Sequence, residues 1–152
     1  MRVGEACTRD VVIVGKEGSI LDAARLMREF HVGDVVVVEE RHGRRRPVGI
    51  LTDRDIVVEL IANEVDYGAV AIKDVMSFQL LTATEDEDIL VAVERMKSRG
   101  VRRLPVVGTQ GDLVGILAVA DLIDLTTELL SDLVALVSNA RKRETVRRRA
   151  AG

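Results

Sequence analysis

The chain has almost no aromatic residues, a single cysteine and no long apolar run. Aromatics make up 2% of its 152 residues and hydrophobic residues 47%, so its core must be built from Val, Ile, Leu, Ala and Met. The lone Cys7 excludes an intramolecular disulfide, which fits a reducing compartment. No apolar stretch approaches the roughly 18 residues of a membrane span, and no secretory leader is recognisable. We therefore expect a cytoplasmic protein without a membrane partner.

Charge is distributed unevenly along the sequence. Residues 141–149 carry six basic side chains and one acid, a charge of +5, and the net charge of −3 therefore leaves −8 for the rest of the chain. An acidic body repels a nucleic-acid backbone, so only this basic tail could attract one. A solvated helix end, favoured by the helix dipole, explains the same residues. Nucleic-acid binding is the less favoured interpretation.

The sequence contains an internal repeat. Residues 3–38 align with residues 72–107 at an offset of 69, with several identical pairs in a consistent order. After a loop that is three residues shorter in the second copy, VGIL at 48–51 recurs letter for letter at 114–117. Chance does not produce such an ordered series, so two copies of a unit of roughly 65 residues organise the chain.

Each copy predicts the element order β-α-β-β-α. A short strand (11–14 or 80–83) leads to a helix that begins after an N-cap, Ser19 or Asp88. A buried strand (35–38 or 104–107), a polar turn (39–46 or 108–112) and a strand ending at Leu51 or Leu117 follow. A second helix closes each copy, over 53–63 and from about Val119. This order predicts an α/β fold in which helices cover sheet faces.

The boundaries follow from this alignment. We expect repeat 1 over residues 3–64, repeat 2 over 65–130, and a C-terminal helix extension with a basic tail over 131–152. The helical spacing of Leu129, Leu133 and Leu136 predicts helix to about Asn139, with fraying beyond it. Cys7 aligns with Met76, which predicts a small buried residue rather than a reactive thiol.

Two motifs carry a family resemblance: VGILTDRDI at residues 48–56 and RRLPVV at 102–107. With the duplicated element order, they make the chain resemble a stand-alone tandem CBS-domain protein. This module is named after cystathionine β-synthase and is also called a Bateman module. The resemblance covers about residues 3–130. It implies two repeats packed sheet to sheet with pseudo-twofold symmetry, and two clefts in which many members bind adenosine nucleotides. It also implies regulation of a partner protein rather than enzyme activity.

Repeat 1 carries the main candidate nucleotide site. Gly49 lacks a Cβ, which lets a backbone or a ligand come close. Thr52 places a hydroxyl and free amides at a helix N-terminus, where an anion is favoured. Asp55, one turn later, can accept two hydrogen bonds from a ribose diol. Thr-x-x-Asp is also close to a capping box, which alone explains Thr52 and Asp55 without a ligand.

Repeat 2 departs from this pattern. It keeps Gly115 and Asp121 but has Ala118 at the position of Thr52. The ribose acceptor is retained and the phosphate-binding hydroxyl is lost. We therefore expect the second cleft to be empty or to bind a nucleotide less well.

Further candidates for the nucleotide site are Val12 and Ile13 in the first strand, and Arg102 and Arg103 between helix and strand of repeat 2. The two arginines could supply positive charge to phosphates, although a solvated turn is the slightly favoured explanation for either one. The acids at 85–88 precede a helix and complement its dipole, so we assign no metal. His31 and His42 have no evident nucleophile partner, so we assign no catalytic residue.

Three functions remain open at this point. The first is a sensor that binds AMP, ADP, ATP or another adenosyl compound and regulates an unidentified partner protein. The second is a ligand-free dimeric scaffold, and the third is nucleic-acid contact through the basic tail. Apolar stripes on the second helix of each repeat, at 56–61 and 122–136, predict a homodimer, because one layer of sheet cannot cover them all.

Overall fold

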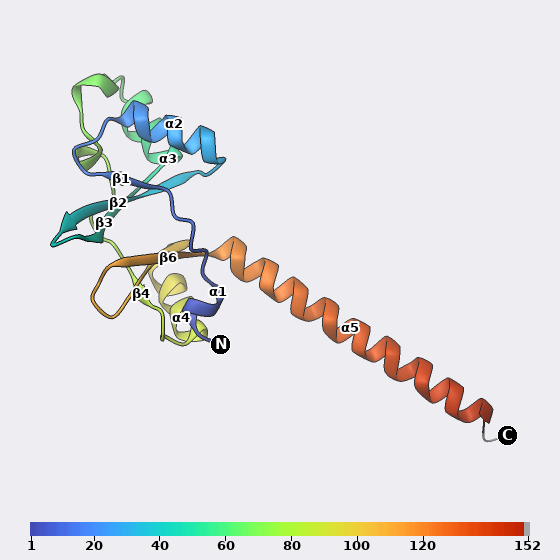
Figure 1. Cartoon of the computed structure of the whole chain (residues 1–152). Helices are drawn as coiled ribbons and strands as arrows, with labels where there is room; N and C mark the ends of the chain where they lie inside the picture. The colour runs from blue at the N-terminus through green and yellow to red at the C-terminus, as the bar shows by residue number, and fades with distance from the viewer. Residues whose placement is uncertain (151–152) are drawn as a thin grey trace.

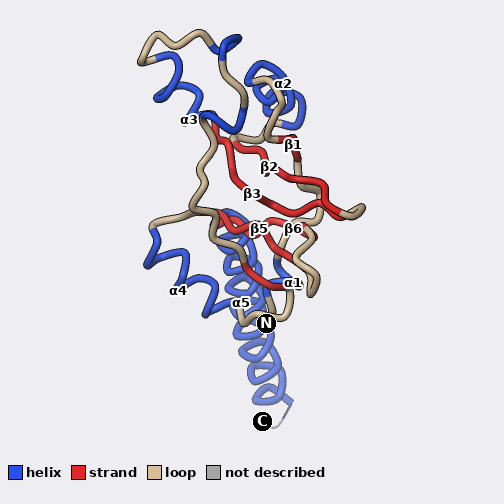
Figure 2. The backbone as a smooth tube through the Cα atoms, turned by 90° about the vertical axis from the view of Figure 1, so that its left-hand side faces the viewer, coloured by secondary structure: helices blue, strands red, loops and turns tan. Residues whose placement is uncertain are grey.

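The computed structural model describes residues 1–150 and contains two three-stranded sheets that face each other, with helices on the outer sides (Figures 1 and 2). The strands of the first sheet are β1 (Ile13–Gly15), β2 (Asp34–Arg41) and β3 (Arg44–Thr52). Those of the second are β4 (Ala83–Thr84), β5 (Arg103–Val107) and β6 (Leu113–Ala118). In each sheet the first strand pairs parallel and the third antiparallel to the central one.

The helices complete two β-α-β-β-α units and confirm the predicted fold. The first unit contains α2 (Ile20–Phe30) and a second helical stretch made of α3 (Asp53–Asp55) and the π-helix η1 (Ile56–Ile61). The second unit contains α4 (Ile89–Arg99) and α5 (Val119–Ala150). Short helices α1 (Val3–Ala6), η2 (Tyr67–Ala69) and η3 (Ile72–Asp74) lie in the segments that lead into the two units. The pseudo-twofold arrangement therefore follows the sequence repeat.

The helix ends explain why α2 and α4 occupy equivalent positions. The Ser19 hydroxyl accepts a hydrogen bond from the Asp22 amide at 3.0 Å, and the Asp88 carboxylate accepts one from the Leu90 amide at 2.8 Å. Both predicted N-caps are confirmed. At the C-termini His31 and Gly100, which align at the offset of 69, both adopt the left-handed conformation of a helix C-cap, with φ of 54° and 64°.

The hairpin between β2 and β3 is longer than the sequence analysis predicts. The predicted eight-residue turn over 39–46 is a two-residue turn at His42 and Gly43, whose φ angles of 52° and 73° match the twist of the strands. Acidic and basic residues lie opposite each other across the strands, Glu39 opposite Arg46 and Glu40 opposite Arg45, an arrangement that favours the extended ladder. The arginines that looked like turn residues therefore belong to β3.

The two units exchange their opening segments. Ile72 and Met76, which precede the second unit, are buried in the core of the first, against Ile20 and Leu51 among others. Val3, which precedes the first unit, is buried in the core of the second. Backbone hydrogen bonds fix both exchanges symmetrically, from Thr8 to Ile116 and from Ser77 to Ile50, each at 2.9 Å. This exchange ties the two repeats into one structure.

The helix α5 leaves the second sheet and extends well beyond the two units (Figure 1). It continues to Ala150, eleven residues past the predicted end at Asn139. Leu129, Leu133 and Leu136 are more than half exposed along it. Among residues 1–150, no helix combines the length and apolar character needed to cross a membrane.

Candidate functional site

A cleft of about 500 Å³ lies where the N-terminus of α3 meets the segment between α4 and β5. Its volume falls in the range of pockets for small ligands, about 300–1,000 Å³. Both repeats and the segment that joins them contribute to its lining. The first repeat supplies Gly33, Ile50 and Thr52 to Asp55, the joining segment supplies Ser77 and Gln79 to Leu81, and the second repeat supplies Gly100 to Arg103.

Thr52 and Asp55 form the capping box that the sequence suggests as an alternative. The Thr52 hydroxyl oxygen accepts a hydrogen bond from the Asp55 amide at 3.1 Å, and Asp55 Oδ2 accepts one from the Thr52 amide at 2.9 Å. Capping leaves part of the hydrogen-bonding capacity of each side chain free. The hydroxyl proton of Thr52 and the Oδ1 atom of Asp55 take no part in the box, so one donor and one acceptor remain for a ligand.

The second repeat keeps half of this arrangement. Asp121 Oδ2 accepts a hydrogen bond from the Ala118 amide at 2.9 Å, the counterpart of the Thr52–Asp55 contact. Ala118 has no hydroxyl to complete the box. The aspartate of each repeat therefore has a structural role at the start of its helix, and only the first repeat adds a hydroxyl beside it.

Gly49 and Gly115 are explained by the exchanged segments rather than by a ligand. A Cβ on Gly49 would lie 2.7 Å from Met76 Sδ and 2.8 Å from the Ser77 carbonyl oxygen. A Cβ on Gly115 would lie 2.8 Å from Cys7 Sγ and 3.0 Å from the Thr8 carbonyl oxygen. Three of these four distances, those below 3.0 Å, are shorter than real Cβ atoms show. The structure places both glycines under a neighbouring backbone and outside the lining of the cleft.

The structure also places Val12 and Ile13 away from this cleft. Val12 packs against the first core, and Ile13 of β1 pairs with Val36 of β2. At the offset of 69, Val12 is the counterpart of Leu81, which does line the cleft. Val12 therefore lies in the region that the pseudo-twofold symmetry relates to this cleft.

Arg102 and Arg103 do reach the cleft from the second repeat, as the sequence analysis allows. Arg103 Nε lies 2.6 Å from Asp34 Oδ2, in an ion pair that joins the two repeats. Burial raises the pKa of the Asp34 carboxyl, while the Arg103 guanidinium opposes this and the neighbouring Asp53 adds to it. The net direction shows that burial disfavours the ionised carboxylate more than Arg103 stabilises it.

Sequence reasoning missed Arg54, Gln79 and Asp34 as residues in or beside the cleft. Arg54 lies inside the VGILTDRDI motif, in which the sequence analysis assigns only Gly49, Thr52 and Asp55 to the site. A signal for Asp34 was present, because Asp34 and Arg103 occupy equivalent positions of the two repeats. Opposite charges at positions related by a pseudo-twofold axis predict an ion pair where that axis brings them together.

Cys7 is half-buried against the second core, and burial raises the pKa of its thiol, which lowers its reactivity. Within residues 1–150, His, Cys, Asp and Glu side chains form no cluster of three or more that could hold a metal ion.

Two β-α-β-β-α units, packed sheet to sheet with a cleft where they meet, define a tandem repeat module. The model of the CBS domain family matches residues 3–62 and 72–128, which is most of the chain. The chain belongs to the CBS domain family.

Known relatives agree with this assignment. An uncharacterized protein of Methanopyrus kandleri is 34% identical over 129 residues, which are 85% of this chain and 64% of the relative. A CBS domain-containing protein of Bacillus subtilis, YhcV, is 36% identical over 79% of this chain and 81% of its own length. Among solved structures, the CBS domain pair of protein MJ0100 superposes with a TM-score of 0.72 at 26% identity, over 84% of this chain and 97% of that one. That structure is a complex with 5-methylthioadenosine and S-adenosyl-L-methionine.

Proposed function

We propose that the cleft at Thr52 and Asp55 binds an adenosine nucleotide or a related adenosyl compound, and that the chain is a regulatory module for a partner protein. The observation that carries this proposal is that a hydroxyl, a carboxylate and several arginines lie around the same cleft. Thr52 with its free hydroxyl proton, Asp55 with its free Oδ1 atom and three arginines, Arg54, Arg102 and Arg103, all line one cleft. The adenosyl ligands of the MJ0100 pair support the ligand class.

The parts of the cleft match the parts of a nucleotide. Asp55 can accept both hydroxyls of a ribose, and Thr52 at the helix start can donate to a phosphate. The arginines supply charge-assisted hydrogen bonds to phosphate oxygens. Apolar walls for an adenine ring come from Ile50, Leu80, Leu81 and Val101.

The equivalent position of the second repeat lacks this set of charges. At the repeat offsets, the phosphate-binding residues of the first cleft have counterparts that are neutral or acidic. Thr52 corresponds to Ala118, Arg54 to Ala120, Arg102 to Gly33 and Arg103 to Asp34. None of these four counterparts has a side chain that can donate a charge-assisted hydrogen bond to phosphate, so we take the first cleft as the main nucleotide site.

A matched pair of substitutions tests the ligand proposal. Asp55→Asn can keep the helix cap through its amide oxygen, but its NH₂ replaces the outward acceptor with a donor. Asp121→Asn makes the same change at the equivalent cap of the second repeat. We expect AMP, ADP, ATP, adenosine or S-adenosylmethionine to raise the melting temperature of the wild type and of Asp121→Asn. The increase should be lost in Asp55→Asn. Equal responses of the two variants would exclude Asp55 as a ribose ligand.

The hydroxyl is tested by Thr52→Ala, which copies the second repeat. A charge-assisted hydrogen bond contributes on the order of 1.5–3 kcal/mol, or roughly ten- to a hundredfold in affinity. Thr52→Ala should therefore weaken ATP and AMP by that factor and adenosine by much less. An equal loss for adenosine would show that the substitution acts on the fold and not on a phosphate contact.

A ligand-free dimeric scaffold is the second candidate function, and exposed apolar helix faces favour it. Val57 and Ile61 on η1 and Leu90 on α4 are between 52% and 74% exposed. We infer a homodimer in either case. If no adenosyl compound raises the melting temperature of the wild type and its mass in solution is that of a dimer, the scaffold function is supported.

A further inference from the structure

The long helix α5 has an apolar stripe that the rest of the chain leaves uncovered. Leu129, Leu133, Leu136 and Ala140 recur at alternating spacings of four and three residues, the a and d positions of a heptad repeat. Leu129, Leu133 and Leu136 are 60%, 52% and 64% exposed. Leu130 and Val137 widen the same face. A stripe of this size on an extended helix needs a covering surface.

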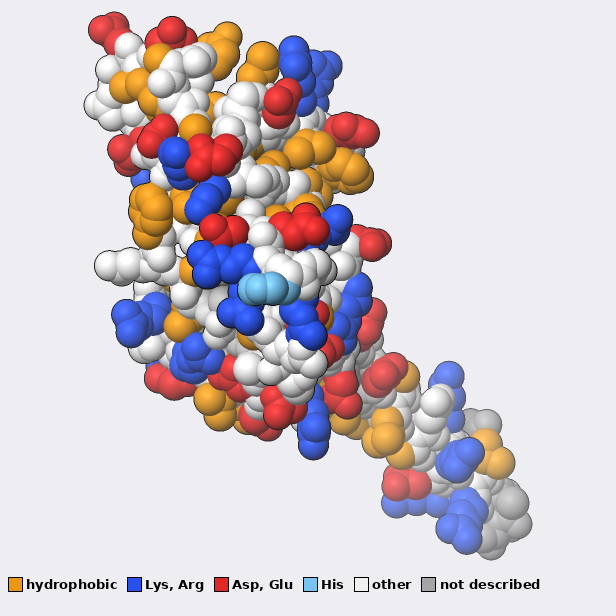
Figure 3. Space-filling model, turned by 60° about the vertical axis from the view of Figure 1, so that its left-hand side comes forward, with side chains coloured by type: hydrophobic (Ala, Val, Ile, Leu, Met, Phe, Trp, Pro, Cys, Tyr) orange, Lys and Arg blue, Asp and Glu red, His pale blue; other side chains and the backbone are white. Residues whose placement is uncertain are grey.

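Charge along α5 is divided into two halves. The first half carries Asp121, Asp124, Glu128 and Asp132, and residues 119–140 contain no lysine or arginine. Residues 141–148 carry five basic side chains and one acid. Figure 3 shows basic side chains gathered toward the far end of this helix. The stripe therefore spans the boundary between an acidic half and a basic half.

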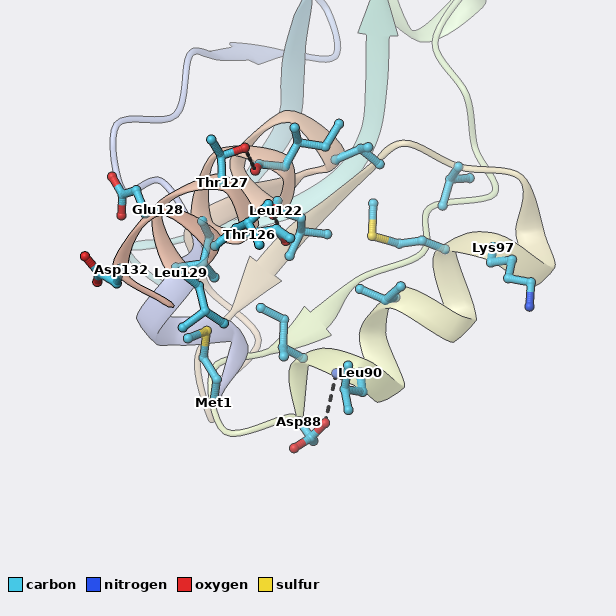
Figure 4. A pocket seen from close by; sticks show the side chains of 18 residues that line it. Met1, Asp88, Leu90, Lys97, Leu122, Thr126, Thr127, Glu128, Leu129 and Asp132 are labelled. Carbon is cyan, nitrogen blue, oxygen red and sulfur yellow. Dashed lines mark hydrogen bonds between the residues drawn. The ribbon is translucent and has the colours of Figure 1, made fainter. Parts of the chain in front are cut away.

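A groove of about 980 Å³ flanks the acidic half, between α4 and α5 (Figure 4). Its floor is apolar and includes Leu90 from α4 and Leu122 and Leu129 from α5. Its charged lining residues are the three acids Asp88, Glu128 and Asp132 and one base, Lys97. The groove therefore suits a helix that is apolar on one side and basic at its edges.

We propose that α5 pairs antiparallel with α5 of a second copy of this chain, so that the basic end of each helix enters the groove of the other. This pairing does not depend on nucleotide binding, and it assigns the homodimer to a particular helix and orientation. In a register centred between Val134 and Ala135, Leu133 lies opposite Leu136 and Leu129 opposite Ala140 of the second copy.

Charge selects this orientation. In the antiparallel register Arg143 and Arg147, which continue the heptad positions of the stripe, lie opposite Thr126 and Leu122 of the second copy. Glu128 and Asp124 lie within a turn of these positions. A parallel pair would place Arg143 and Arg147 against their own copies and the acids against acids, which is destabilising. The acidic half also makes an anionic lipid surface a poor partner for the same face.

The first test is the mass of the full chain in solution by light scattering. The wild type should have twice the chain mass of 16.7 kDa. Leu133→Glu combined with Leu136→Glu should halve that mass, because both leucines lie at the centre of the pairing. Ser131→Glu combined with Ser138→Glu introduces the same two charges on the opposite side of α5 and should remain dimeric. Circular dichroism and the melting temperature check that each variant is folded.

The orientation is tested by disulfide trapping in a Cys7→Ala background. Chains with Leu129→Cys and chains with Ala140→Cys, distinguished by a size tag, should form mixed disulfides when combined. Neither variant should cross-link with itself, because residues 129 and 140 are eleven residues apart, about 16 Å along a helix. Self-linking of Leu129→Cys would show a parallel pair and overturn the proposal.

Other results would also overturn it. A double glutamate variant that keeps the wild-type mass would show that other surfaces hold the dimer. A monomeric wild type that sediments with vesicles of phosphatidylserine and phosphatidylcholine would show that α5 covers its stripe with lipid. By contrast, a wild type that binds no nucleotide but forms the expected mixed disulfides would contradict the proposed function and support this pairing, because the two are independent.

Discussion

Replacing Asp34 with Asn changes the charge at the junction of the two repeats without changing the side-chain volume. The Asp34 side chain is 10% exposed and lies 2.6 Å from Arg103 Nε. Burial raises the pKa of its carboxyl above the ordinary value of 3.8. An acid whose pKa is higher in the folded state than in the unfolded state lowers the free energy of unfolding as the pH rises above its unfolded-state pKa. The loss is complete once the pH exceeds its folded-state pKa. Asp34→Asn should therefore gain free energy of unfolding over the wild type as the pH rises above about 3.8.

The same substitution should strengthen binding of phosphorylated ligands. It releases Arg103 from its ion pair and removes a negative charge beside the cleft. Two unit charges about 4 Å apart interact by about 1 kcal/mol in water and about 4 kcal/mol at a protein surface. Arg103 is one-third exposed, so we take about 1.5 kcal/mol, roughly tenfold in affinity. Calorimetry should show ATP bound about tenfold more tightly and adenosine nearly unchanged.

Glu39→Gln on the same strand is the matched control. The side-chain hydrogen bond from Lys16 lowers the pKa of the Glu39 carboxyl below 4.5. A carboxyl whose pKa is lowered by folding stabilises the fold at pH values above its unfolded-state pKa. This stabilisation is lost as the pH falls through its folded-state pKa. Glu39→Gln should therefore lose stability at neutral pH and match the wild type in acid, with no change in ATP affinity. Weaker ATP binding by Asp34→Asn, or the same pH trend in both variants, would refute the reasoning.

Other expectations follow from the exchanged segments and their contacts. Gly49→Ala should destabilise the fold by about 1–3 kcal/mol in urea unfolding, because its Cβ would lie 2.7 Å from Met76 Sδ. Gly15→Ala, with no atom within 4 Å of its Cβ, should stay near wild type, and equal losses would contradict the packing argument. Cys7 should react slowly with iodoacetamide at pH 7.5 and fast only after unfolding, because burial raises its thiol pKa. Rapid labelling of the folded chain would place Cys7 at the surface.

The sequence predicted the elements that local chemistry decides. Two copies agreed on the helix starts, and Ser19 and Asp88 proved to be N-caps in equivalent positions. The ends of the shortest strands were less well predicted. β1 runs over Ile13–Gly15 and β4 over Ala83–Thr84, because only the residues that pair with the central strand adopt the ladder. Periodicity shows that a strand is present but does not show where its partner begins.

The exchange of opening segments could not be read from periodicity. Val3 and Ile72 looked like apolar residues of their own repeats, and each is buried in the other one. Nothing local distinguishes the two choices, since the repeats offer nearly identical cores. The glycines held the relevant signal. Gly49 and Gly115 lie where a foreign backbone crosses the last strand of each unit, and close approach was one of the two roles considered for Gly49.

The candidate site was predicted in part. Thr52, Asp55, Arg102 and Arg103 are all in one cleft. Gly49 and Gly115 are outside its lining because they serve the packing of neighbouring segments. The role of the Thr52–Asp55 capping box was undecided from the sequence, because capping and ligand binding require the same residue types. The structure shows that capping uses one atom of each side chain.

The number of nucleotides bound per chain tests the central claim most directly. The two repeats give two equivalent positions for a ligand, but only the one at Thr52 and Asp55 combines a free hydroxyl with three arginines. Calorimetric titration of the wild type with ATP should therefore give one high-affinity site per chain, lost in Asp55→Asn and retained in Asp121→Asn. No heat with ATP, AMP, adenosine or S-adenosylmethionine, or two sites of equal affinity, would contradict the account.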